Sequence, residues 1–264
     1  MTIQNMILTS KPSLLLGLFS SLICSLSVIQ AADSVSPPQT SSVSLENAVW
    51  EVFTDRSGIA ALLLSEDGQT LWVGTTAGLE QRHPETGEVK RIFTHLDGLP
   101  NNAISALAND GQGGIWVGTD NTDLTSLNNI AASSGLAHYH SDGTWAIFNT
   151  HNAALPSDNI LSLHVDNRHG IWVGTTKGLA YRHPDGTWQR FEEEQSELPK
   201  DKIYWATSLV GDNQGGIWMG AWMGKSTLLA HREANGTWEI FNSDKAQLPE
   251  SYITSLLGDG KGGL

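Results

Sequence analysis

The sequence predicts an all-β chain made of repeated four-stranded units, and three observations support this. A string close to Gly-Ile-Trp-Val-Gly-Thr recurs four times, at Trp72, Trp116, Trp172 and Trp218. Those tryptophans are 44, 56 and 46 residues apart. Short apolar alternations separated by Gly, Asp, Asn and Pro turn signals surround each copy. Four strands in about 45 residues match the strand number and length of one propeller blade, so we expect a β-propeller.

Each repeat is expected to contain strands A to D. In the third repeat these strands run over Ile160–Val165, Ile171–Thr175, Leu179–Arg182 and Trp188–Phe191. The strand-B tryptophan is expected to fill the wedge between neighbouring blades, and the glycine two residues later permits close backbone approach. These glycines are Gly74, Gly118, Gly174 and Gly220.

The repeats predict four blades over residues 59–93, 104–148, 160–191 and 203–241, with a fifth beginning at Ile253. Trp50–Phe53 matches strand D, and we expect it to be the outer strand of the last blade. Four blades and these strands of a fifth close no ring. We therefore expect residues 49–264 to be an incomplete propeller, the N-terminal part of a longer protein.

The first residues predict export. Residues 1–31 hold an apolar run over Leu14–Ile29 and a small-residue end at Ala31, which is typical of a cleaved signal peptide; an uncleaved anchor is the alternative. Residues 32–48 are rich in Ser and Pro and are expected to be a linker. The net charge of −13 argues against nucleic acid and anionic membranes as partners.

The repeat resembles the two-component regulator propeller repeat. The resemblance rests on Gly-Ile-Trp-Val-Gly-Thr-x-x-Gly-Leu at residues 170–179, on Gly-x-Trp-x-x-Phe in the strand-D region, and on Leu-Pro before strand A. In that family, propellers form the periplasmic sensor part of bacterial membrane receptors. The resemblance implies seven blades in the full protein, a membrane helix and a kinase or other output beyond residue 264, and a possible homodimer.

Departures from the repeat suggest a binding face. The B–C connection of the second repeat carries an insertion over Asp120–Ser134, and the fourth repeat replaces Thr-Thr-x-Gly with Ala221–Ser226. The D–A and B–C loops of a four-stranded blade emerge on the same face, and insertions in repeat proteins often mark the binding face. We expect the signal, a small molecule or glycan, to contact residues that share this location: Tyr204, Trp205, Trp222, Met223, Asp120 and Asp123. Ordinary loop variation is the alternative.

No catalytic motif is present, so we expect neither enzyme activity nor a cofactor in this chain. His83 and His183 repeat in Arg-His-Pro and are expected to be turn residues. His138 and His140 allow a metal pair, and the Asp-rich A–B turns allow calcium, but tight-turn chemistry explains the turns better. The leading interpretation is an exported sensor module. A secreted polysaccharide-acting enzyme and a protein-interaction scaffold are the alternatives, because fold alone does not give function.

Overall fold

The computed structural model describes residues 58–121, 134–191, 204–224, 226–242, 248 and 251–264, and the dipeptides Ile23–Cys24 and Trp50–Glu51. The chain divides into two compact units, Met1–Thr54 and Asp55–Leu264. No helix among these residues is long and apolar enough to cross a membrane. The predicted signal peptide and linker lie almost wholly outside the described residues and stay predictions.

In the first unit, β1 (Ile23–Cys24) pairs antiparallel with β2 (Trp50–Glu51). This differs from the expectation that Trp50–Phe53 completes a blade. The Trp50–Glu51 backbone finds its partner in the chain's own β1, and residues 52 and 53 lie outside the described part of the chain.

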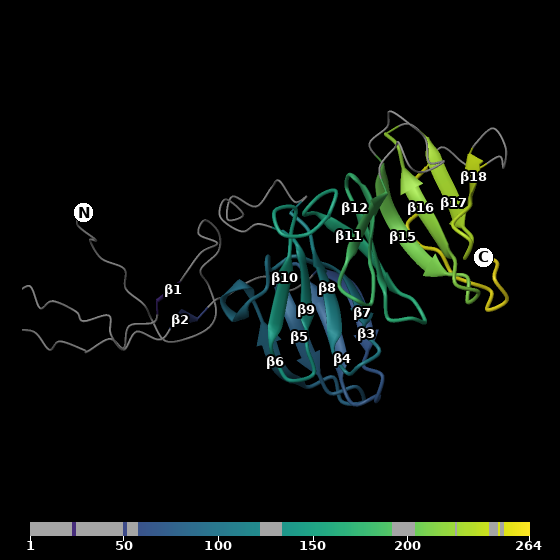
Figure 1. The fold of residues 1–264 in the computed structure, drawn as a ribbon. Helices are drawn as coiled ribbons and strands as arrows, with labels where there is room; N and C mark the ends of the chain where they lie inside the picture. The colour runs from purple at the N-terminus through teal and green to yellow at the C-terminus, as the bar shows by residue number, and fades with distance from the viewer. Residues whose placement is uncertain are drawn as a thin grey trace, which may run out of the picture. The chain divides into compact units, whose positions relative to one another are not determined.

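The second unit contains four antiparallel sheets of four strands each, and in every sheet the strands follow one another in chain order (Figure 1). This confirms the predicted all-β propeller fold of four-stranded blades. We call the sheets blades 1 to 4 and their strands A to D. Blade 1 is β3 (Ile59–Leu64), β4 (Leu71–Thr75), β5 (Gly78–Arg82) and β6 (Val89–Phe93). Blade 2 is β7 (Ile104–Asn109), β8 (Ile115–Thr119), β9 (Leu136–Tyr139) and β10 (Trp145–Phe148). Blade 3 is β11 (Ile160–Val165), β12 (Ile171–Thr175), β13 (Gly178–Arg182) and β14 (Trp188–Phe191). Blade 4 is β15 (Trp205–Gly211), β16 (Ile217–Trp222), β17 (Thr227–Arg232) and β18 (Trp238–Asn242).

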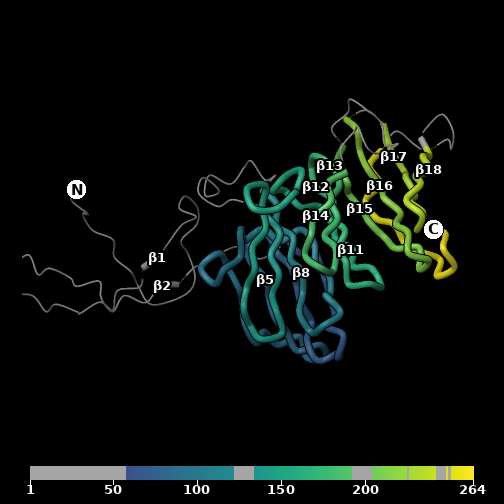
Figure 2. The backbone as a smooth tube through the Cα atoms, viewed as in Figure 1, coloured from purple at the N-terminus to yellow at the C-terminus, as the bar shows by residue number. Residues whose placement is uncertain are grey.

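Successive blades lie beside each other through their A strands, as the tube in Figure 2 also traces. The strand-B glycines make this contact possible. A methyl group on Gly74 would lie 2.6 Å from Cγ2 of Ile104 in the next blade, and one on Gly174 would lie 2.5 Å from the carbonyl oxygen of Ala206. Only a residue without Cβ fits between two backbones this close.

A cross-blade hydrogen bond accompanies the glycine contact. The hydroxyl of Ser105 donates to the carbonyl of Ile160 at 2.6 Å, and that of Ser162 donates to the carbonyl of Ala206 at 2.8 Å. In each case the carbonyl belongs to the A strand of the next blade. Each A–B ladder also has a register irregularity beside this point, for example between Ile160 and Ser162.

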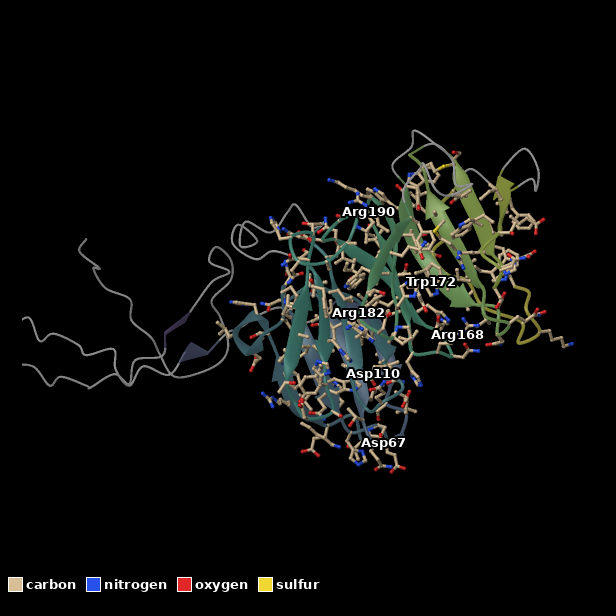
Figure 3. All side chains as sticks on the ribbon, viewed as in Figure 1. Asp67, Asp110, Arg168, Trp172, Arg182 and Arg190 are labelled. Atoms are coloured by element: carbon tan, nitrogen blue, oxygen red, sulfur yellow. The ribbon has the colours of Figure 1, made fainter. Side chains whose placement is uncertain are left out.

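The strand-B tryptophans fill the wedges between blades. Trp172 is 5% exposed, and the guanidinium carbon of Arg232 in blade 4 lies 5.6 Å from its ring centroid. Arg182 has the same relation to Trp116 one blade earlier, also at 5.6 Å. Figure 3 labels Trp172 and Arg182 in these wedges. Such cation–π contacts contribute roughly 0.5–2 kcal/mol each, so the wedge joins neighbouring blades as well as filling space.

The expected fifth strand A is not a ladder strand. Residues 251–264 contact β15 instead through side chains: the hydroxyl of Thr207 donates to the carbonyl of Ile253 at 2.6 Å, and the amide of Leu256 donates to the hydroxyl of Ser208 at 2.9 Å. Among the described residues this segment is not assigned as a strand, because no described strand pairs with it. Its place is still that of a next blade, since Cγ2 of Ile253 would lie 2.6 Å from a methyl group on Gly220.

Candidate functional site

One structurally equivalent position varies sharply from blade to blade. It is formed by the residue at the start of strand A and the residue at the end of strand B, which meet across the A–B ladder. The backbone amide of Thr76 donates to the carbonyl of Gly58, and the amide of Thr176 donates to the carbonyl of Asn159. In blades 1 to 4 the pairs are Gly58 and Thr76, Ala103 and Asp120, Asn159 and Thr176, and Trp205 and Trp222. We call this position the rim pair; only blade 4 fills it with two aromatic residues.

The blade 4 rim pair forms an exposed aromatic cluster with Tyr252. The Trp222 and Tyr252 ring centroids are 4.4 Å apart, and those of Trp205 and Tyr252 are 6.5 Å apart. Trp205 is 40% exposed and Tyr252 is 51% exposed. A contiguous patch of exposed aromatic side chains leaves apolar surface in contact with water, which is unfavourable, and such a patch often marks a contact surface. Single, scattered exposed apolar residues carry no such meaning. We call Trp205, Trp222 and Tyr252 the aromatic cluster.

The backbone holds the aromatic cluster in place. Thr227, the first residue of β17, has a hydroxyl that donates to the carbonyl of Ser251 and accepts from the amide of Ser251. Together with the bond from Thr207 to Ile253, this fixes both neighbours of Tyr252. Trp205 and Trp222 sit on paired strands. All three rings are therefore positioned by hydrogen-bonded backbone, which favours a preformed surface.

The structure corrects the sequence analysis on the fourth B–C connection. Trp222 was expected in a loop, but it is the last residue of β16 and pairs with Thr227 as well as with Trp205. The physical reason is the longer ladder of this blade: β16 and β17 have six residues each, against five for β12 and β13. Met223 follows the strand and packs partly buried against the core.

The other predicted site residues do not join the cluster. Tyr204 is 4% exposed, and its ring packs 3.6 Å from a methyl placed on Gly178, so it is a core residue between blades 3 and 4. Asp120 is the rim residue of blade 2, and blade 3 stands between it and blade 4. Asp123 lies outside the described residues.

The aspartates of the A–B turns have a structural role. Asp110 Oδ1 accepts from the amides of Gln112 and Gly114 at 2.7 and 2.8 Å, which closes the turn. Its Oδ2 accepts from His138 Nε2 at 2.8 Å, and the imidazole of His138 stacks on Trp116 with centroids 3.9 Å apart. Although burial opposes ionisation, these hydrogen bonds hold the pKa of Asp110 below its ordinary value.

The same unit recurs in blades 3 and 4. Asp166 Oδ2 accepts from the hydroxyl of Tyr181 at 2.7 Å, and Asp212 Oδ2 accepts from His231 Nε2 at 2.9 Å. In each blade a strand-C side chain therefore connects the turn aspartate to the strand-B tryptophan. The metal pair considered for His138 and His140 competes with this role, because His138 Nε2 already bonds Asp110. The described residues hold no group of three or more potential metal-ligating side chains.

His83 and His183 are turn residues, as the repeated Arg-His-Pro predicts. The amide of His183 donates to the carbonyl of Thr187 at 2.8 Å, and that of His83 donates to the carbonyl of Glu88 at 2.8 Å. Both residues close C–D hairpins. The imidazole of His83 accepts from the amides of Glu85 and Thr86, so it stabilises its own turn.

The sequence analysis missed Tyr252. A signal was present, because Tyr252 stands directly before Ile253 as Trp205 stands directly before Ala206, and Ile253 and Ala206 both accept the cross-blade hydroxyl bond. Aromatic residues at one repeat position in two consecutive repeats would have identified the pair. The cluster contains no carboxylate, histidine or lysine, so its chemistry is that of a surface for stacking and apolar contact.

Comparisons with known proteins agree with this architecture. The model of the family described as two component regulator propeller matches residues 98–121 and 154–177. Each segment runs from the Leu-Pro element to just past strand B. A comparison with curated proteins gives no match.

Solved structures share the fold. The extracellular domain of BT3049, assigned to a hybrid two-component system of B. thetaiotaomicron, is 18% identical with a TM-score of 0.59, over 75% of this chain and 24% of that chain. The extracellular domain of BT4673 from the same organism is 21% identical with a TM-score of 0.58, over 77% and 24%. The β-propeller domain of Cps50 (Swd1) from Myceliophteria thermophila is 16% identical with a TM-score of 0.53, over 80% and 62%. The chain thus spans about a quarter of the length of the two B. thetaiotaomicron domains. From its blades and these matches, the chain has a β-propeller fold, and two of its repeats, at residues 98–121 and 154–177, match the two component regulator propeller family.

Proposed function

We propose that this chain is the ligand-sensing propeller on the extracytoplasmic side of a bacterial signal-transduction receptor. The predicted signal peptide, the two-component regulator propeller repeats and the extracellular neighbours support the location and the class. The chain binds a signal and has no catalytic part in this proposal. The output that reads the signal belongs to the whole receptor.

The aromatic cluster is the single observation that carries the binding role. Scaffold positions keep the same residue types from blade to blade: Trp and Gly on strand B and Asp in the A–B turn of blades 2 to 4. The rim pair departs from this rule most strongly at Trp205, which is exposed, and at Trp222, which is half-buried; neither belongs to the buried core cluster of this blade. A residue that breaks a repeat without a packing reason is a candidate for recognition.

The chemistry of the cluster favours a ligand with flat apolar faces and a polar periphery. Indole and phenol rings offer large stacking area with one polar group each. Oligosaccharides present alternating apolar faces and hydroxyl edges, so we propose a neutral or weakly charged glycan segment as the signal. The chain's charge of −13 disfavours a strongly anionic one through long-range repulsion.

The test is calorimetric titration of the purified chain with a panel of neutral hexasaccharides of glucose, xylose and mannose in different linkages. At least one is expected to bind, and Trp222→Ala is expected to weaken that binding about tenfold, which corresponds to about 1.4 kcal/mol. Leu96→Ala is the matched control, because Leu96 is 63% exposed and lies in the D–A connection between blades 1 and 2, on the same face.

Equal binding by the Trp222→Ala and Leu96→Ala variants would exclude the aromatic cluster as the contact surface. Absence of binding to every member of the panel would contradict the glycan assignment. Thermal unfolding of both variants checks that each still folds.

A further inference from the structure

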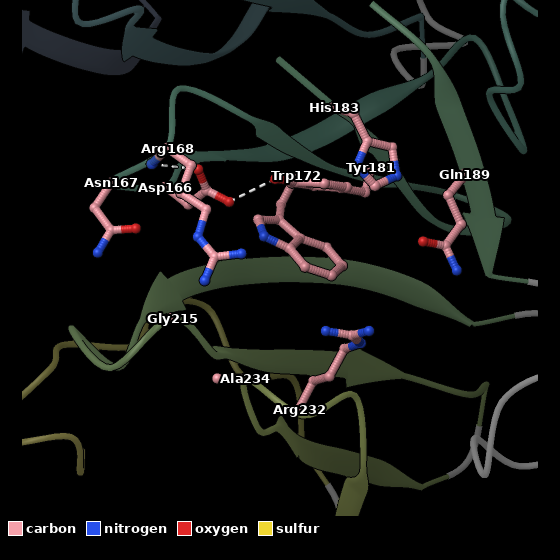
Figure 4. A pocket seen from close by; sticks show the side chains of 10 residues that line it. All are labelled: Asp166, Asn167, Arg168, Trp172, Tyr181, His183, Gln189, Gly215, Arg232 and Ala234. Atoms are coloured by element: carbon pink, nitrogen blue, oxygen red, sulfur yellow. Dashed lines mark hydrogen bonds between the residues drawn. The ribbon is translucent and has the colours of Figure 1, made fainter. Parts of the chain in front are cut away.

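A pocket lies at the other end of the strands from the aromatic cluster, between blades 3 and 4. It has a volume of about 190 Å³ and lies on the side of the A–B and C–D turns (Figure 4). Arg168 comes from the A–B turn of blade 3 and Gln189 from strand D, while Gly215 and Arg232 come from blade 4. Trp172 forms the wall between the two arginines.

The pocket is open because blade 4 lacks a side chain that blade 3 has. In blade 3 the fourth residue of the A–B turn is His169, whose Nδ1 lies 3.3 Å from the carbonyl oxygen of Asp110 in the preceding blade. The equivalent residue of blade 4 is Gly215, and only Ala234 Cβ, at 3.4 Å, would lie near a methyl placed there. The space that an imidazole covers between blades 2 and 3 is therefore left open between blades 3 and 4.

Within the described part of the chain, the two arginines of the lining have no carboxylate partner. Arg232 Nε is buried and has no hydrogen-bond partner, and no ion pair joins either Arg232 or Arg168 to a carboxylate among the described residues. The one carboxylate in the lining, Asp166, is already engaged: Oδ1 accepts from the amides of Arg168 and Gly170, and Oδ2 accepts from the hydroxyl of Tyr181.

Both arginines remain available to a ligand. Arg232 stays a cation although burial lowers its pKa, because a guanidinium is not deprotonated in proteins. Figure 4 shows its head group facing Trp172 and the head group of Arg168 entering from the turn. Two arginines and one aspartate give the lining a net charge of +1 in a protein whose net charge is −13.

We propose that this pocket binds a small dicarboxylate, with one carboxylate on Arg232 and the other on Arg168. The planar guanidinium matches a carboxylate with two parallel hydrogen bonds, which makes such pairs strong and specific. A volume of about 190 Å³ holds several water molecules, which leaves room for a small organic ligand. The amides of Asn167 and Gln189 at the margin suit hydroxyl groups on that ligand.

The experiment is calorimetric titration of the purified chain with L-tartrate, with threitol, and with sulfate. Tartrate carries two carboxylates and two hydroxyls on four carbons, threitol replaces both carboxylates by neutral groups, and sulfate is a small dianion of different shape. Tartrate is expected to bind, threitol to give no binding, and sulfate to bind at least tenfold more weakly than tartrate.

Two matched variants locate the site. Arg168→Ala is expected to weaken tartrate binding at least tenfold, while Lys177→Ala is expected to leave it unchanged. Both residues are exposed and both changes remove one positive charge from blade 3, but Lys177 lies at the B–C end. Ala234→Phe, at an exposed turn residue that lines the pocket, is expected to weaken binding by filling the space.

The proposal is overturned by any of three results. The first is that tartrate fails to bind. The second is that Arg168→Ala and Lys177→Ala change tartrate binding equally. The third is that sulfate binds as tightly as tartrate. Thermal unfolding of each variant without ligand shows that it is folded, so a loss of binding reports on the pocket.

Discussion

The close approach of neighbouring blades at Gly174 makes a sharp prediction about stability. A methyl group at this position would lie 2.5 Å from the carbonyl oxygen of Ala206 and would collide with the hydroxyl of Ser162. The obstacle is backbone of the next blade, which no side-chain rotation relieves. Gly174→Ala must therefore push blades 3 and 4 apart or displace the hydroxyl.

The magnitude follows from three contributions. Inserting one carbon into a packed interior costs about 1–3 kcal/mol. Losing the bond from Ser162 to the carbonyl of Ala206 costs about 1 kcal/mol more. Replacing a strand glycine by alanine restores about 0.5–1 kcal/mol of backbone entropy. We expect the free energy of unfolding to fall by roughly 1–3.5 kcal/mol, or the melting temperature by about 2–14 °C for a unit of this size.

Urea unfolding followed by tryptophan fluorescence measures this loss, and an unchanged m-value shows that the two proteins unfold over the same surface. Gly87→Ala is the control. Gly87 has φ of 71° in a C–D turn and no atom within 4 Å of an added methyl, so only left-handed strain of about 1 kcal/mol applies. If Gly174→Ala costs no more than Gly87→Ala, the explanation of the repeated strand-B glycine by blade contact is wrong.

Three further predictions concern polar groups in the blades. Ser162→Ala removes one cross-blade hydrogen bond to Ala206 and should lower the free energy of urea unfolding by about 1 kcal/mol; an unchanged value would show that this bond is not stabilising. Tyr181→Phe leaves Asp166 Oδ2 without its donor and should cost roughly 1–2 kcal/mol in the same assay, whereas a gain would contradict the structural role of the turn aspartate. Burial lowers the pKa of His164 below its ordinary value of 6.5, so the folded chain binds this proton less tightly than the unfolded chain. The contribution of His164 to the free energy of unfolding is then complete above the unfolded pKa, and it is lost as the pH falls from that value through the lower folded pKa. His164→Asn should therefore flatten the pH dependence of urea unfolding between pH 7.5 and 5. An unaltered slope would refute the assignment.

The strands could be predicted from the sequence because their signals are local. In blade 3 the expected strands A, B and D coincide with β11, β12 and β14, and strand C begins one residue earlier, at Gly178. Alternating apolar residues and turn residues specify such strands directly. The pairing of Trp50–Glu51 and the segment from Ile253 were not predicted, because pairing depends on which partner strand is present and not on the strand's own pattern.

The candidate site was only partly predictable for a related reason. Deviation from the repeat indicated Trp205 and Trp222, but it gave the same weight to Tyr204, which the fold buries between blades. Asp120 shares the rim position of Trp222 in another blade, which a linear spacing does not reveal. The dicarboxylate pocket depends on Gly215 standing where blade 3 has His169, and that comparison becomes visible only when the turns are superimposed in space.

Hydrogen–deuterium exchange with and without a bound hexasaccharide tests the sensing proposal most directly, because it locates the contact on the chain itself. The account predicts added protection of backbone amides at 204–206, 221–224 and 251–254, around Trp205, Trp222 and Tyr252, and no change in the A–B turn at 166–170. Protection confined to that turn, or to blades 1 and 2, would contradict the assignment of the aromatic cluster as the surface that contacts the signal.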